Sequence, residues 1–169
     1  MSTTSASAPG KIILFGEHAV VYGQPAIAAP VSFLRAWASV GDGELPGVYI
    51  SAPDLDEEYW LQDSDEDDSL AAAIHIVQQA AHLPALPPLH IEVRSDIPIA
   101  GGLGSGAATA AALIRALTRH LNLPHLAEDD RVAELTYEVE KIHHGTPSGI
   151  DNTVVALEKP VYFVRRLPH

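Results

Sequence analysis

Apolar and polar side chains alternate along residues 89–94, and this pattern predicts a strand that is buried on one face. Runs rich in β-branched, aromatic and other apolar residues predict further strands at residues 11–15, 19–22, 26–40, 48–51 and 161–164. Pro30 stands inside the third of these runs, so we expect a bend or a strand edge there.

Other stretches have a helical spacing of their apolar residues. This spacing occurs at residues 70–81, at 107–121 and from about 128 to 142, and each stretch predicts an amphipathic helix. The acid-rich residues 54–68 predict a solvated loop. The short apolar run at 154–157 fits a helix or a strand. Because strands and helices mingle along the chain, we predict an α+β fold.

Size and charge narrow the possibilities. The 169 residues suit one domain, residues 1–169, with a sizeable core. The net charge of −12 would repel nucleic-acid phosphates and anionic lipids, so we expect neither nucleic acid nor membrane as a partner. The chain contains no cysteine, which excludes disulfides and thiolate metal sites. Residues 1–8 lack the features of a signal peptide, so we expect a cytoplasmic protein.

A glycine-rich loop stands directly before the second predicted helix. Glycine has no Cβ and the first turn of a helix leaves its N–H groups unpaired, so such a loop can hold a phosphate group. The candidate phosphate-binding residues are Gly101, Gly102, Leu103, Gly104, Ser105, Gly106 and Ala107. Their spacing matches neither the Walker A motif nor the dinucleotide fingerprint. A purely structural turn would also explain these glycines.

Two other segments carry candidate chemistry. Lys11 begins a predicted strand, and Glu17 and His18 follow a glycine in the turn after it. Glu140 lies near the end of a predicted helix, where the helix dipole disfavours a carboxylate and a bound cation would compensate it. Asp151 follows a Pro-Ser-Gly loop. Taken singly, Lys11 could be a surface lysine and the turn after it an ordinary polar turn. Glu140 could likewise be an acid at a helix end, and Asp151 the cap of the next element.

Together, the three segments supply the parts that phosphoryl transfer from ATP requires. The glycine loop would hold the phosphates, and Ser105 and Glu140 would bind Mg²⁺ through oxygen atoms. Lys11 would supply a positive charge, and Asp151 would accept the proton of the acceptor hydroxyl. We therefore predict ATP and Mg²⁺ as cofactors.

The same segments resemble motifs of the galactokinase–homoserine kinase–mevalonate kinase–phosphomevalonate kinase (GHMP) superfamily, and within it those of the mevalonate kinase family. The motifs occur in the family's order at residues 9–23, 98–108 and 140–152, and the resemblance extends from about residue 8 to about residue 164. It implies the fold of the superfamily's N-terminal ATP-binding lobe, which is similar to domain 2 of ribosomal protein S5.

The resemblance also implies roles for particular residues. Asp151 would be the catalytic base beside Lys11, and Glu140 would bind Mg²⁺. The residues that would line the mevalonate site are Glu17, His18 and Ser148. The implied reaction is ATP-dependent phosphorylation of the primary hydroxyl of mevalonate, a step of isoprenoid precursor biosynthesis. Phosphomevalonate kinase, mevalonate 3-kinase and galactokinase are the alternatives within the superfamily.

The chain departs from the family pattern in two respects. Gly106 stands where the family often has a second serine, so the metal role falls on Ser105. The resemblance implies a second lobe of comparable size, whereas the sequence ends at His169. We therefore expect either a lobe that needs a separate C-terminal lobe or a homodimer for activity, or a non-catalytic truncated or split lobe.

Overall fold

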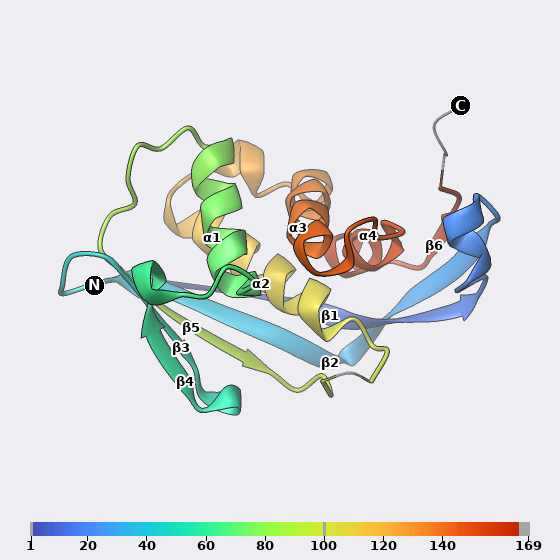
Figure 1. Ribbon diagram of the computed structural model, residues 1–169, viewed down its shortest axis with the longest axis horizontal. Coiled ribbons are helices and arrows are strands. Elements are labelled where there is room, and N and C mark those ends of the chain that lie inside the picture. The colour runs from blue at the N-terminus through green and yellow to red at the C-terminus, as the bar shows by residue number, and fades with distance from the viewer. Residues whose placement is uncertain (1, 100, 166–169) are drawn as a thin grey trace.

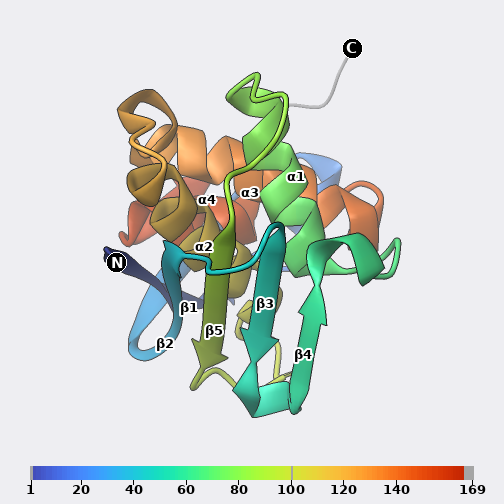
Figure 2. The ribbon, with the colours of Figure 1, turned by 90° about the vertical axis from the view of Figure 1, so that its left-hand side faces the viewer.

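A mixed β-sheet carries the helices on one of its faces in the computed structural model, which describes residues 2–99 and 101–165 (Figures 1 and 2). The strands are β1 (Thr3–Phe15), β2 (Ala26–Asp42), β3 (Val48–Ala52), β4 (Glu57–Trp60), β5 (Leu89–Ser95) and β6 (Val161–Phe163). The α-helices are α1 (Ser69–Ala80), α2 (Ser105–His120), α3 (Asp129–His144) and α4 (Ile150–Leu157). Short 3-10 helices are η1 (Ala19–Tyr22), η2 (Pro53–Leu55), η3 (Leu61–Asp63) and η4 (Pro124–Leu126).

The strand order in the sheet is β1-β2-β5-β3-β4, with β6 paired to the start of β2. The β3–β5 pair is parallel, and the other pairs are antiparallel. The register between β1 and β2 shifts between Pro9, which pairs with Arg35, and Gly10, which pairs with Val31, so β2 has three extra residues there. Because a bulge bends the strand that contains it and increases the local twist, the β1–β2 pair changes direction at this point. Lys11 follows directly after this change of direction.

Helix α2 is the centre of the core. Its residues from Ala107 to Thr118, Thr109 excepted, are buried, because the helix packs on β1 and β2 below and on its three neighbouring helices. Alanine has the highest helix propensity and a small side chain, so the alanine-rich sequence favours the helix and lets it approach the sheet closely. Leu113 and Leu117 fill the space between these alanines and are fully buried. Because α2 is held in place by this buried packing, the glycine loop at its N-terminus is held in place as well.

Most of the predicted elements are confirmed. The strands at 26–40, 48–51, 89–94 and 161–164 and the three predicted helices occur with ends shifted by a few residues, and the strand at 11–15 occurs as the end of β1, which begins eight residues earlier at Thr3. Burial alternates along β5 as the sequence predicts. The run at 154–157 belongs to α4, because Gly149 with φ of 88° turns the chain into a helical first turn. In the part of the chain that the structure describes, no helix is both long enough and apolar enough to cross a membrane.

Two of the predictions are wrong. Residues 19–22 form the 3-10 helix η1 and not a strand, because Gly16 and Gly23 adopt positive φ and Val20 N–H bonds back to the Gly16 carbonyl at 2.9 Å. Residues 54–68 are not a simple loop but include the edge strand β4, which pairs with β3. The two glutamates that open β4 are exposed at this edge, so strand pairing and acidic composition are compatible there.

Candidate functional site

A cavity of about 560 Å³ opens at the glycine loop and the start of α2. One wall contains all of the residues predicted to bind phosphate or metal or to act in catalysis. These are Lys11, Gly101, Gly102, Leu103, Gly104, Ser105, Gly106, Ala107, Glu140 and Asp151. They come from β1, the loop before α2, α2 itself, α3 and α4, so the fold gathers three distant sequence segments at one place. Their functional roles remain proposals.

Lys11 and Asp151 form an ion pair in this wall. Lys11 Nζ lies 3.0 Å from Asp151 Oδ2, and the exposed fractions of the two side chains are 6% and 29%. A buried ammonium group requires a partner because desolvation of an unpaired charge is costly. Asp151 lies in the first turn of α4, where the helix dipole favours a carboxylate. The aspartate therefore offers one side to the lysine and the other to the cavity.

The glycine loop lies directly against Lys11. Lys11 N–H donates a hydrogen bond of 2.8 Å to the carbonyl oxygen of Leu103. Gly104 has a φ of 69°, and a Cβ at this position would lie 2.8 Å from Lys11 Cγ and 3.0 Å from its Cε. Two features therefore require glycine at position 104: the left-handed backbone conformation, and the lysine side chain that occupies the place of a Cβ. The loop and the ion pair form one structural unit.

The start of α2 also faces Glu140 from α3. A Cβ at Gly106 would lie 3.9 Å from Glu140 Oε1, which places this carboxylate oxygen beside the first turn of α2. Unpaired N–H groups give this turn a partial positive charge, and Ser105 adds a hydroxyl oxygen. Among the side chains that the structure describes, no group of three acidic or histidine residues is placed to hold a metal ion. The Ser105 hydroxyl and the Glu140 carboxylate are thus the predicted oxygen donors in this wall.

The predicted mevalonate-site residues lie elsewhere. Glu17 and His18 are exposed in the turn between β1 and η1, and neither lines the cavity. Ser148 precedes α4 and lines a separate hollow of about 680 Å³ together with Tyr137 and Phe163. The structure therefore does not bring these three residues to the glycine loop, and their role at a substrate site stays a prediction.

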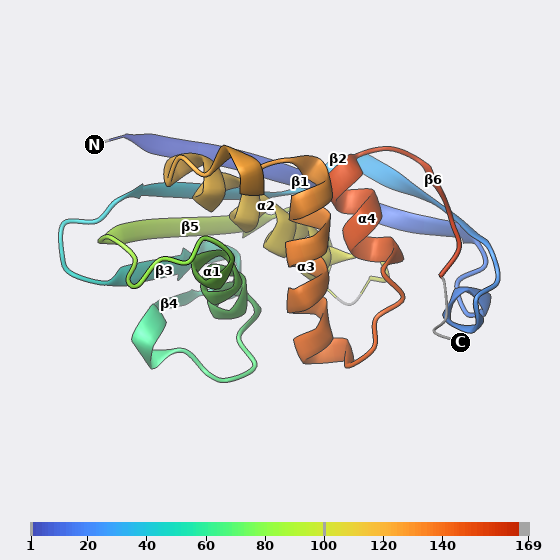
Figure 3. The same cartoon turned by 90° about the horizontal axis from the view of Figure 1, so that it is seen from above.

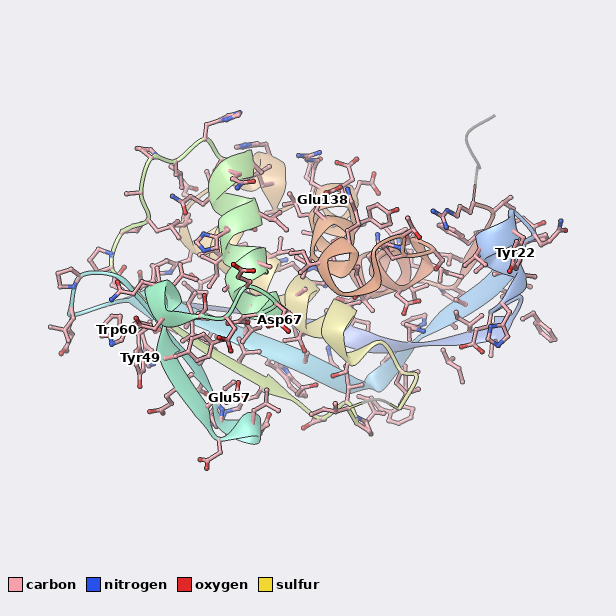
Figure 4. The ribbon with its side chains drawn as sticks, in the orientation of Figure 1. Tyr22, Tyr49, Glu57, Trp60, Asp67 and Glu138 are labelled. Carbon is pink, nitrogen blue, oxygen red and sulfur yellow. The ribbon has the colours of Figure 1, made fainter. Side chains whose placement is uncertain are left out.

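The opposite wall contains residues that the sequence analysis missed. They are Asp54, Leu55, Glu57, Tyr59, Asp68, Ser69, Leu70, Val93, Ile97 and Pro98. Many of them come from the acidic segment that was predicted to be a solvated loop, and Figure 4 labels Glu57 and Asp67 in this region. A signal existed for Asp68, since an aspartate before a helical repeat is a typical N-cap. Its Oδ1 accepts the N–H groups of Leu70 and Ala71 at 2.8 and 3.3 Å.

Tyr59 gives this wall a defined polar group. Burial, and then a hydrogen bond to the Asp68 carboxylate, raise the pKa of the Tyr59 phenol above its ordinary value. The phenol therefore stays protonated at neutral pH and acts as a hydrogen-bond donor. The cavity thus has a lysine and two acids beside the glycine loop, and apolar side chains mixed with Tyr59 and three further acids in the rest of its lining.

A glycine loop, a buried lysine–aspartate pair and a nearby glutamate in an α+β lobe are typical of small-molecule phosphotransferases. Residues 68–159 match the family described as GHMP kinases N terminal domain. The chain therefore belongs to the GHMP kinase family. The predicted resemblance to this superfamily and the predicted fold of its N-terminal lobe are both confirmed.

Known relatives agree with this assignment. The chain is 38% identical to a mevalonate kinase of Thermococcus onnurineus over 90% of its own length and 49% of that protein. It is 35% identical to a mevalonate kinase of Archaeoglobus fulgidus over 86% of its length. The crystal structure of the Methanococcus jannaschii mevalonate kinase superposes with a TM-score of 0.87 at 26% identity, covering 97% of this chain and 54% of that one. The chain spans about half the length of the curated relatives it matches.

Replacing Gly104 by alanine tests the close approach of the loop to Lys11. Gly102 is the matched control, because its φ of 71° is similar but its Cβ position has no neighbour within 4 Å. We expect Gly102→Ala to lower the free energy of unfolding by about 1–2 kcal/mol through backbone strain alone. Gly104→Ala must also displace Lys11, so we expect about 2–4 kcal/mol. Chemical denaturation measures both, and equal losses would contradict the contact.

Proposed function

We propose that this chain is the ATP-binding lobe of a kinase that transfers the γ-phosphoryl group of ATP to the primary hydroxyl of mevalonate. The observation that carries this proposal is the Lys11–Asp151 ion pair, which lies against the glycine loop in one cavity. The mevalonate kinases that match the chain support the choice of substrate. The proposed reaction would belong to isoprenoid precursor biosynthesis.

The proposed chemistry follows from the groups in the cavity. The carboxylate of Asp151 would accept the proton of the substrate hydroxyl as its oxygen forms a bond to the γ-phosphorus. The bond from this phosphorus to the oxygen of the leaving ADP would break, and the ammonium of Lys11 would stabilise the negative charge that develops. Backbone N–H groups at the start of α2 would hold the phosphates. The apolar side chains and Tyr59 on the other side of the cavity would face the rest of the nucleotide.

The residues present fit a magnesium ion. Mg²⁺ binds oxygen ligands, keeps several waters and is usually held by few protein carboxylates together with substrate phosphates. Ser105 and Glu140 line the cavity at the same end of α2 and offer such a set, and a Cβ at Gly106 would lie 3.9 Å from Glu140 Oε1. Bound there, the ion would neutralise charge on the phosphate oxygens. Ser105 and Glu140 would hold it through the hydroxyl and carboxylate oxygens.

An ADP-release assay over several alcohols tests this function. The chain would be assayed alone and joined to the C-terminal half of a matching mevalonate kinase, with mevalonate, phosphomevalonate and galactose as acceptors. We expect turnover with mevalonate in the joined protein. Turnover with phosphomevalonate alone would favour the phosphomevalonate kinase alternative. If the joined protein turns over none of the acceptors, the chain is a non-catalytic lobe.

An exposed apolar row on this chain offers a surface for a second lobe. Phe15, Ile27 and Tyr162 lie opposite one another on the paired strands β1, β2 and β6, and they are 70%, 39% and 72% exposed. The buried residues of the same strands pack against Ile150 and Val154 of α4 on the other face. We propose that the second lobe covers this apolar row, because the matching relatives are about twice as long as the chain. A homodimer is the competing occupant.

Polar substitutions test this surface. We expect Phe15→Ser and Tyr162→Ser to lower the binding of a hydrophobic dye to the isolated chain, with stability changed by no more than about 0.5 kcal/mol. Leu45→Ser is the matched control, because Leu45 is 62% exposed and lies outside the row. Joining the second lobe should abolish the dye signal of the unsubstituted protein. A dye signal that persists there, or a concentration-dependent dimer that the substitutions dissociate, would contradict the proposal.

A further inference from the structure

Arg115 is a buried charge that the proposed chemistry does not use. It lies in the middle of α2, and its side chain is 5% exposed. Its guanidinium donates hydrogen bonds to the Ser7 carbonyl at 2.9 Å, to Glu158 Oε1 at 2.8 Å and to Asp129 Oδ1 at 2.9 Å. It also donates to the Ala156 carbonyl oxygen. A single side chain therefore contacts three elements besides its own.

These three elements carry the candidate functional residues. Ser7 lies on β1 shortly before Lys11, and Asp129 opens α3, which carries Glu140 further along. Ala156 and Glu158 lie at the end of α4, which has Asp151 in its first turn. Arg115 itself follows the glycine loop on α2. Figure 3 shows α2, α3 and α4 next to one another. The hydrogen bonds of Arg115 to Ser7, Asp129 and Ala156 place its guanidinium at the junction of α2 with β1, α3 and α4.

A second arginine strengthens this junction from the sheet. Arg35 of β2 donates to Ser7 Oγ at 3.0 Å and to Glu158 Oε2 at 2.9 Å. Glu158 has a φ of 53°, a backbone conformation that residues other than glycine adopt infrequently. Arg115 and Arg35 therefore both donate hydrogen bonds to the carboxylate of Glu158 at the end of α4. The end of this helix is held against β1 by charge-assisted hydrogen bonds, which are stronger and more directional than neutral ones.

We propose that Arg115 is a positioning residue that sets the distance between Lys11 and Asp151. The proposal deepens the proposed function and rests on it for its consequence in catalysis. Helix α4 is short and separated from α3 by a glycine-containing loop, so its direction depends on what holds its ends. Without the guanidinium, the Ser7 and Ala156 carbonyls lose their common donor, and β1 and α4 can move relative to each other. Lys11 and Asp151 would then no longer meet at 3.0 Å.

A double-mutant cycle on the 169-residue chain tests this inference without requiring turnover. The variants Lys11→Met, Asp151→Asn and the pair are compared by chemical denaturation, first with Arg115 and then with Arg115→Met. We expect the coupling between Lys11 and Asp151 to fall at least twofold in the Arg115→Met background. A merely structural arginine would lower the stability of every variant equally and leave the coupling unchanged, which would overturn the proposal.

Two further variants keep the test decisive. Arg131→Met is the matched control. Arg131 is an arginine of α3 that pairs with Glu134 of the same helix, so its loss removes an ion pair within one element and not a link between elements. If Arg115→Met does not fold, Arg115→Lys replaces it, since a lysine keeps the charge but cannot reach four acceptors. In the joined protein, a misplacement of about 1 Å should lower kcat by about 10²-fold with KM changed little. If Arg115→Lys changes neither kcat nor the coupling between Lys11 and Asp151, the inference is overturned. If the joined protein is inactive even with Arg115 present, only the proposed function is contradicted.

Discussion

Asp151→Asn is expected to lower kcat for phosphoryl transfer to mevalonate by about 10²–10⁴-fold, the range that a general base contributes. Asparagine keeps the size and the first-turn position of the side chain but cannot accept a proton from the substrate hydroxyl. The affinity for nucleotide should change little, because the glycine loop and not Asp151 would hold the phosphates. ADP release by the joined protein measures kcat, and titration with a nonhydrolysable nucleotide measures affinity.

Asp130→Asn is the control for this substitution. Asp130 is an exposed aspartate in the first turn of α3, as Asp151 is in the first turn of α4, so both changes remove the same helix-dipole interaction. Undiminished kcat in Asp151→Asn would remove this residue from the proposed mechanism. A comparable loss in both variants would show that helix stability, and not proton transfer, is being measured.

The sequence predicted the fold well where a pattern reports on local burial. The alternation in β5 and the apolar spacing of α1, α2 and α3 each arise from one buried face, and a single periodicity describes them. Periodicity failed where tertiary pairing decides. The β4 residues carry two glutamates and resemble a loop, yet β3 offers a free edge for them. In η1 the apolar residues suggested a strand, but glycines at both ends impose a tight turn.

The candidate site was predictable to a different extent on its two walls. The wall with Lys11, Glu140, Asp151 and the glycine loop could be named because each residue type has a chemical reason to be there. That these residues converge depends on the register shift between β1 and β2 and on the packing of α4, which leave no local signal. The opposite wall mixes apolar side chains with Tyr59 and three carboxylates, and their proximity to the loop is set by the sheet order and by the position of α1.

Lys11→Met is the second substitution with a large expected effect. Methionine preserves an apolar stem under Gly104 but removes the ammonium, so we expect kcat to fall by about 10²–10³-fold, as when one electrostatic donor is removed from an active site. Lys11→Arg should not restore activity, although it keeps the charge. The guanidinium is longer and planar, so it cannot place its charge where the compact ammonium lies 3.0 Å from Asp151 Oδ2.

The stabilities of the two variants distinguish this pair from an ordinary surface ion pair. Lys11→Met leaves a carboxylate that is 29% exposed and can be hydrated, whereas Asp151→Asn leaves a nearly buried ammonium without its counter-ion. We therefore expect Asp151→Asn to lower the free energy of unfolding by about 1–3 kcal/mol, and Lys11→Met to lower it by less. Chemical denaturation of both variants gives the comparison. If Lys11→Met were the more destabilising, or retained full kcat, the lysine would be a packing residue and the proposed electrostatic role would be wrong.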